Sequence, residues 1–234
     1  MKNQYFADVN DYFKYDLCIF LAENLPGIQR FTFIPTLTAN DGKKDGNKVV
    51  YPMGVGQESL YKFLKGCLQK NQREVVHLWD YFKGQDFKFD YCPYADSLDK
   101  EFTHSNREEY FQNIPDEDLQ SAVIMVDPDN GLEVKAARPG NFHKYIKYSE
   151  ARQLYGRMDA NSVLIIYQHF PFIERRFFLE GLHARILEEL NCPAPMTVFS
   201  SNIAMVMLAK NAAARKRLHK QVSRYLRREL KLHE

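Results

Sequence analysis

The sequence predicts an α/β fold: a mainly parallel sheet, helices on both faces, and a C-terminal antiparallel hairpin. The apolar runs 122–126 and 162–167 are each bounded by turn residues, which is typical of strands buried on both faces. A helical pattern at 149–155 lies between them, and a crossover of this kind makes the two strands parallel. The apolar runs 196–199 and 203–208 are separated by three polar residues, which predicts the hairpin.

The first half of the chain predicts helices at 11–24 and 57–69, where apolar residues recur at helical spacing. A strand is expected at 31–37, followed by a loop at 38–48 that is rich in turn residues. Weaker patterns predict strands at 74–81 and 87–91 and short helices at 106–111 and 116–120. The second half adds helices at 174–190 and 212–230.

The bulk composition indicates one domain over residues 1–234. A chain of 234 residues with 45% hydrophobic residues can bury a sizeable core, and no linker or low-complexity segment divides it. No apolar run approaches the roughly 20 residues of a membrane span, and acidic residues near the N-terminus exclude an ordinary signal peptide. We therefore expect a cytoplasmic protein without a membrane partner.

Positive charge is concentrated in the last predicted helix. The final 25 residues carry nine Lys or Arg against two Glu, whereas the rest of the chain is net acidic. Cations at helical spacing form a stripe that can follow a phosphate backbone, although a solvated helix face is the alternative. Nucleic acid is thus the expected partner, and the candidate contacts are Arg175, Arg217, Lys220, Arg224 and Arg228.

The strongest site signal is the turn that directly follows the strand at 122–126. The sequence there is DPDNG, residues 127–131, in which proline ends the ladder and Asn-Gly favours a positive φ. Asp127, Asp129 and Asn130 therefore emerge at the carboxyl end of a central strand, where open α/β sheets place their ligand crevices. They are candidate catalytic residues, and simple turn capping is the alternative.

A second polar group ends the neighbouring parallel strand. His169 should share the crevice with Asp127, where an imidazole can act as a general base or as a ligand. A histidine bonded to a backbone carbonyl is the alternative. Arg175 and Arg176 follow in the first turn of a helix, where cations oppose the helix dipole. That placement suggests an anionic ligand or a surface ion pair.

The N-terminal segment 3–15 is dense in polar and aromatic residues, and Asn10 or Asp11 is expected to cap the first helix. With DPDNGLEV and YQHFP, it resembles a family of uncharacterised bacterial and phage-encoded proteins that open NQYFGDxNDYxKYGLL. The resemblance covers most of the chain and implies no established activity. Ala7 and Asp16 stand here where that family usually has glycine.

Residues 121–210 also resemble the methyltransferase branch of the Rossmann-like folds, in which an Asp-Pro motif follows the fourth strand. Its D-P-P-[YFW] motif holds a target amino group, and this chain matches only the acid and the first proline. The N-terminal segment is more distantly similar to the G-N-x-A-D-x-x-K-H opening of a ribosomal-RNA adenine methyltransferase family, in which it shapes the cofactor site. The resemblance implies S-adenosylmethionine as the cofactor, with the candidate residues Asp8, Asn10, Lys14, Asp41 and Asp45.

The loop after the first strand departs from that resemblance, because residues 38–46 lack the glycine-rich turn of such cofactor sites. The leading hypothesis is a nucleic-acid-directed enzyme on a methyltransferase-like scaffold. The first alternative is a metal-dependent nuclease or phosphodiesterase, in which Asp127, Asp129 and Glu133 hold Mg²⁺ or Mn²⁺ and Lys135 or His169 serves as the base. The second is a non-catalytic phage or mobile-element interaction protein.

Overall fold

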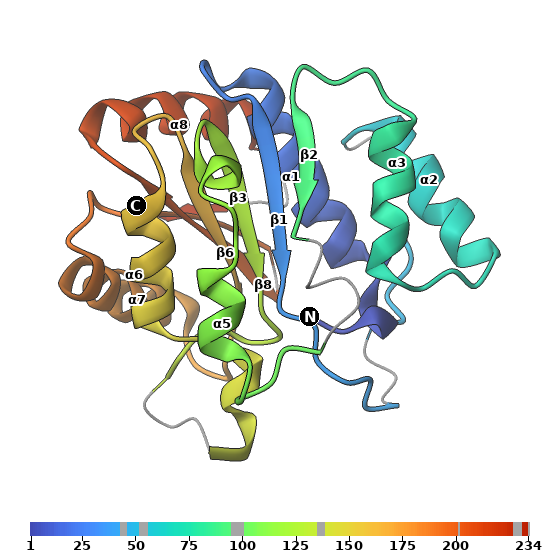
Figure 1. The fold of residues 1–234 in the computed structure, drawn as a ribbon, viewed down its shortest axis with the longest axis horizontal. Helices are drawn as coiled ribbons and strands as arrows, with labels where there is room; N and C mark the ends of the chain where they lie inside the picture. Colours follow the sequence, from blue (N-terminus) through green and yellow to red (C-terminus); the bar gives the residue numbers. More distant parts are fainter. Residues whose placement is uncertain are drawn as a thin grey trace.

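A computed structural model of the chain describes residues 1–42, 46–51, 56–94, 101–134, 139–200, 202–226 and 231–233 (Figure 1). Within these residues, one seven-stranded sheet has the order β2-β1-β3-β6-β8-β7-β9. Its strands are β1 (Arg30–Pro35), β2 (Asp90–Pro93), β3 (Ala122–Asp127), β6 (Val163–His169), β7 (Met196–Phe199), β8 (Ile203–Ala209) and β9 (Lys231–His233). The first four positions of the sheet are parallel, whereas β8 runs antiparallel to both of its neighbours.

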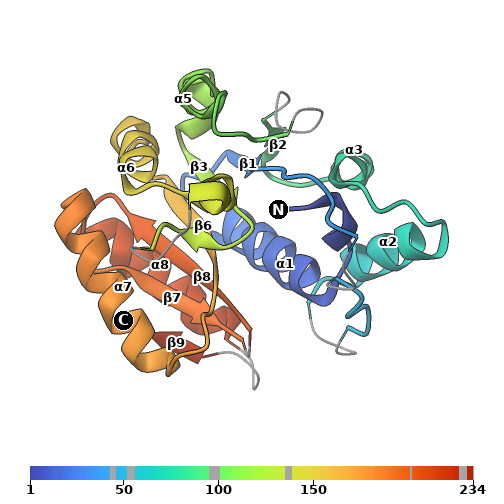
Figure 2. The ribbon, with the colours of Figure 1, turned by 90° about the horizontal axis from the view of Figure 1, so that it is seen from below.

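Helices cover both faces of the sheet, as the sequence predicted (Figure 2). The helices are α1 (Val9–Asn24), α2 (Glu58–Gln69), α3 (Leu78–Lys83), α5 (Arg107–Gln112), α6 (Tyr148–Arg157), α7 (Arg175–Leu190) and α8 (Ala212–Tyr225). Helices α1, α2 and α8 pack on one face, and α5, α6 and α7 pack on the other. A short two-stranded sheet pairs β4 (Gly131–Leu132) with β5 (Tyr145–Ile146) beside the turn that follows β3.

The sequence of β3 is apolar without alternation because both faces of this strand are buried. Val123 and Met125 belong to the core on the α1 face, while Ile124 and Val126 belong to the core on the α6 face. All four side chains are fully buried. A strand covered on both faces needs apolar residues at every position, so the run at 122–126 was correctly predicted as a central strand.

Two sequence-based predictions of local structure are wrong. Residues 74–81 form a 3-10 turn, Val75–His77, and then α3 rather than a strand. Leu78, Tyr81 and Phe82 are buried at i, i+3 and i+4, so one helical face carries the aromatic residues that suggested a strand. The last helix, expected to reach residue 230, ends at Tyr225. The chain then returns to the sheet as β9, which pairs with β7 outside the predicted hairpin.

No helix in the described part of the chain combines the length and the apolar character that a membrane crossing requires.

Candidate functional site

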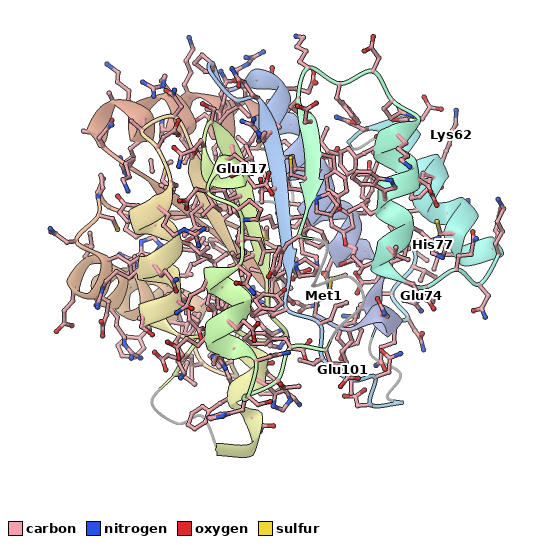
Figure 3. The ribbon with its side chains drawn as sticks, in the orientation of Figure 1. Met1, Lys62, Glu74, His77, Glu101 and Glu117 are labelled. Carbon is pink, nitrogen blue, oxygen red and sulfur yellow. The ribbon has the colours of Figure 1, made fainter. Side chains whose placement is uncertain are left out.

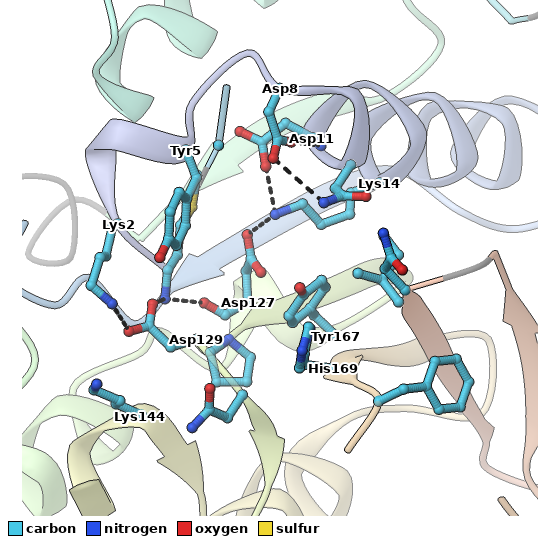
Figure 4. A pocket seen from close by; sticks show the side chains of 18 of the residues that line it. Lys2, Tyr5, Asp8, Asp11, Lys14, Asp127, Asp129, Lys144, Tyr167 and His169 are labelled. Carbon is cyan, nitrogen blue, oxygen red and sulfur yellow. Dashed lines mark hydrogen bonds and ion pairs between the residues drawn. The ribbon is translucent and has the colours of Figure 1, made fainter. Parts of the chain in front are cut away.

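A cavity of about 820 Å³ opens at the carboxyl ends of β3 and β6 (Figure 4). The N-terminal segment and the start of α1 close over it from the side. In the sheet, β1 lies between β2 and β3. After β1 the chain adds β2 on one side of β1, and it then crosses over to add β3 on the other side. Parallel sheets form their ligand crevices at the carboxyl ends of strands beside such a reversal.

Lys14 is the central cation of the site. Its Nζ lies 2.6 Å from Asp127 Oδ2 and 2.6 Å from Asp11 Oδ1, and all three side chains are at most 5% exposed. Asp11 and Lys14 are neighbours because they are three residues apart on α1. Burial lowers the pKa of Lys14, but the two carboxylates outweigh burial and raise that pKa above its ordinary value. The lysine is therefore charged and links α1 to the end of β3.

Asp8 caps α1 and faces the same cavity. Its carboxylate accepts a hydrogen bond from the backbone N–H of Asp11 at 2.8 Å, so Asp8 is the N-cap rather than Asn10 or Asp11. Burial, assisted by the nearby charge of Asp11, raises the pKa of Asp8 to about 7. Burial also raises the pKa of Asp11, against the opposing effect of Lys14. The cavity wall thus carries a carboxyl group that exchanges its proton near neutral pH.

Asp129 fastens the N-terminus of the chain to the sheet. Its carboxylate pairs with the Met1 ammonium at 2.8 Å and with Lys2, and it accepts a hydrogen bond from Thr38 Oγ1 at 2.7 Å. Burial opposes ionisation, but these partners outweigh it and hold the pKa of Asp129 well below its usual range. The ammonium also donates to the carbonyls of Thr36 and Asp127, so Met1 links the ends of β1 and β3. Figure 3 shows Met1 beside the end of β1.

Gln168 fixes the turn that follows β3. Its Oε1 accepts from the N–H of Leu132 at 2.9 Å, and its Nε2 donates to the carbonyl of Asn130 at 3.0 Å. Gly131 has a φ of +113°, and a Cβ there would lie 2.2 Å from Gln168 Oε1. The backbone N–H of His169 donates to the Asn130 carbonyl at 3.0 Å. Asn130 and His169 are therefore held together at the cavity wall.

The cavity gathers most of the residues that the sequence singled out. The predicted site residues that line it are Asp8, Asn10, Lys14, Asp41, Asp127, Asp129, Asn130, His169 and Arg175. Asp45, Lys135 and Arg228 lie outside the described residues. Glu133 accepts a hydrogen bond from the N–H of Tyr148 at 3.0 Å at the start of α6. Arg217, Lys220 and Arg224 lie on α8, away from the cavity lining.

The described residues contain no group of three His, Cys, Asp or Glu side chains arranged to hold a metal ion. Asp127 is paired with Lys14, and Asp129 is paired with Lys2 and the Met1 ammonium. A divalent cation would have to displace these cations, and Glu133 is bound elsewhere. Of the three acids predicted to hold Mg²⁺ or Mn²⁺, Asp127 and Asp129 line the cavity, and Glu133 is not among its described lining residues.

Several side chains of the site escaped the sequence reasoning, among them Asp11, Tyr167 and Gln168 and the cavity-lining lysines Lys2, Lys48 and Lys144. Asp11 could have been found from its i, i+3 spacing to Lys14, which predicts an ion pair on a helix. The ring of Tyr167 lies 5.0 Å from Lys14 Nζ, and Gln168 binds the turn across the sheet. These two contacts depend on strand register, for which the sequence carries no local signal.

Comparison of this chain with protein-family models, with curated proteins and with solved structures finds no match.

Proposed function

We propose that the cavity binds S-adenosylmethionine and that the protein transfers its methyl group to an amino group of a nucleic-acid base. The contact that carries the proposal is the one between Lys14 and Asp127, 113 residues apart. The resemblance to methyltransferases assigned Lys14 to the cofactor side and Asp127 to the target side. A single cavity that holds both residues is what a methyltransferase site requires.

The strand order supports the same proposal. Strand β8 lies antiparallel between β6 and β7, so a hairpin completes the parallel part of the sheet. A hairpin in this place is what the resemblance to the methyltransferase branch of the Rossmann-like folds implies. The additional strand β9 extends the sheet beyond the hairpin and contributes no residue to the cavity lining.

The lining suits the cofactor in size and in charge. Small-molecule sites typically enclose about 300–1,000 Å³, and this cavity has about 820 Å³. Asp8 and Asp41 would hold the cationic groups and ribose hydroxyls, and Lys144 would hold the carboxylate. No glycine-rich turn follows β1, and Met1 already uses the carbonyls of Thr36 and Asp127, so side chains rather than backbone would provide the contacts.

The bound cofactor would supply an electrophilic methyl group. Asp127 is engaged by Lys14, so the carboxamide of Asn130 is the group that would orient the target amino group. That amino nitrogen must lose a proton as it gains the methyl group. The exposed ring of His169, on the same cavity wall, would accept the proton as a general base.

Cofactor binding is tested by titrating S-adenosylmethionine and recording both the melting temperature and the heat of binding. A ligand at about 100 times its Kd stabilises the folded state by about 2.7 kcal/mol, so Tm should rise. Asp41→Asn should weaken binding. Asp80→Asn, an exposed acid on α3, is the matched control and should bind like the parent. No shift and no heat at about 1 mM cofactor, where even a binding free energy of about −4 kcal/mol is detectable, would overturn the cofactor assignment.

Methyl transfer is tested with cofactor that carries a radioactive methyl group and with single-stranded RNA or DNA. The parent should label the nucleic acid, and His169→Gln should lower the rate by roughly a hundredfold or more. Cofactor affinity should be unchanged in this variant because the ring acts on the target. Equal rates in parent and variant would remove His169 from the reaction.

A further inference from the structure

An apolar group of side chains is exposed at the mouth of the cavity, in the segment that connects β6 to α7. The exposed fractions of Phe172, Ile173 and Phe177 are 111%, 51% and 73%. Phe172 and Ile173 also line the cavity. Scattered exposed hydrophobic residues are ordinary, but three within six residues beside a ligand-sized cavity mark an interaction surface.

Cationic groups accompany these rings. Arg175 lines the cavity, and its guanidinium lies 5.5 Å from the centre of the Phe170 ring. The acid of the segment, Glu174, accepts hydrogen bonds from the backbone of Arg176 and Phe177, so its charge is directed into the start of α7. Lys48 and Lys144 line the same cavity. The lining also holds five aspartates, of which Asp11 and Asp127 pair with Lys14 and Asp129 pairs with Lys2. The cations that accompany the rings at this opening are Lys48, Lys144 and Arg175.

We infer that the segment 170–177 is a stacking platform for the bases of single-stranded nucleic acid, with Phe172 and Phe177 as its rings. Aromatic rings flanked by cations are how proteins hold unpaired strands, because bases stack on the rings and phosphates meet the cations. The turn at Asp127 lacks the aromatic residue of the D-P-P-[YFW] motif. Phe172 provides a ring in the same cavity from the neighbouring strand end.

This inference names the form of nucleic acid that the proposed enzyme would bind. It rests on the proposed function for the claim that the bound base is then methylated. An unpaired strand can place a base in the cavity directly, whereas a duplex must first unstack and unpair it. The positive charge around the rings favours a nucleic acid over an apolar segment of another protein as the occupant.

The test measures binding of a fluorescein-labelled single-stranded RNA of about 12 nucleotides, within the length that one such platform covers. Stacking contributes about 1–3 kcal/mol per base, so Phe172→Ala and Phe177→Ala should each weaken binding roughly fivefold to a hundredfold. Phe172→Tyr retains a ring and should bind like the parent. Leu187→Ala changes another exposed apolar residue of α7, 41% exposed, and should also leave binding unchanged.

Binding by the parent that Phe172→Ala leaves unaltered, or no binding by the parent, would overturn the platform. Equally tight binding of the same sequence as a duplex would overturn the preference for unpaired strands. Phe172→Ala should have the same melting temperature as the parent in the absence of any ligand, which shows that the variant is folded. If the protein does not bind S-adenosylmethionine but its RNA binding depends on Phe172, the result would support the platform and refute the methyltransferase proposal.

Discussion

Ala7 adopts a left-handed backbone conformation, with a φ of +63°. Its N–H donates to Asp11 Oδ2 at 3.2 Å and its carbonyl accepts from the hydroxyl of Tyr51, so the surroundings impose this conformation. Glycine adopts a positive φ without the steric cost that a Cβ imposes.

Ala7→Gly should therefore raise the free energy of unfolding by about 1 kcal/mol, since the left-handed conformation costs a residue with a Cβ about 1–2 kcal/mol. Urea denaturation measures the change. Ala22→Gly is the matched control, because Ala22 is buried in the last turn of α1 and this variant should lose about 1 kcal/mol of stability. Loss of stability in both variants would show that the backbone at residue 7 carries no strain.

Asp8 makes the folded chain less stable as pH rises, whereas a carboxylate with a lowered pKa makes it more stable. Its pKa is raised from 3.8 to about 7 by burial and by Asp11, so the folded chain binds this proton more tightly than the unfolded chain. Its contribution to stability is most favourable at low pH, falls as pH rises from about 4 to about 7, and is constant above that range.

Asp8→Asn keeps a side chain that caps the helix and removes the ionisable group. The variant should be more stable than the parent at about pH 8, and the difference should shrink toward about pH 5 as Asp8 takes up its proton. Urea unfolding at several pH values across that window measures both. A difference between parent and variant that stays constant with pH would contradict the raised pKa.

Among the elements, the turn between β3 and β4 contributes Asp129 and Asn130 to the site and depends on one glycine. Gly131→Ala would place a methyl group 2.2 Å from Gln168 Oε1 at a φ of +113°. We expect a loss of about 1–3 kcal/mol from backbone strain alone. Adding Gln168→Ala to this variant should restore only the stability that is lost through the contact between the new methyl group and Gln168. Denaturation of the single and double variants separates the two, and a neutral Gly131→Ala would show that the turn adapts freely.

Elements differ in how well the sequence predicts them. Strand β3 and its turn were predicted because a doubly buried strand needs an uninterrupted apolar run, and DPDNG ends it locally. Helix α3 was missed because its aromatic residues satisfy a strand pattern over a short window. Strand β9 was missed because it exists only through its pairing with β7, and nothing within residues 231–233 specifies that partner.

At the scale of the whole molecule, the sequence predicted the features of the site that follow from local patterns and missed those that depend on contacts between distant residues. His169 and Asp127 could be placed in one crevice because parallel strands carry their carboxyl ends to one edge. The ion pairs of Lys14 with Asp127 and of Lys2 with Asp129 could not, since each joins residues more than a hundred positions apart. Those contacts decide which carboxylates can reach a ligand. The sequence therefore predicted that Asp127 and His169 share one cavity, but it did not predict that Lys14 pairs with Asp127 there.

Asp16 joins three helices across the α1 face of the sheet. Its carboxylate accepts from the backbone N–H of Gln57 at 2.7 Å, just before α2, and from the hydroxyl of Tyr225 at 2.6 Å, at the end of α8. Asp16 is 2% exposed, so loss of either donor leaves a buried charge with fewer partners.

Tyr225→Phe should lower the free energy of unfolding by about 1–3 kcal/mol, the cost of leaving a buried acceptor without its donor. Neither Asp16 nor Tyr225 lines the cavity, so cofactor and RNA affinity should stay at the parent values. Tyr148→Phe is the control, because its hydroxyl makes no hydrogen bond among the described residues, and its stability should match the parent. Unchanged stability in Tyr225→Phe would mean that α8 is held by its apolar contacts, Leu218 and Val222, without help from Asp16.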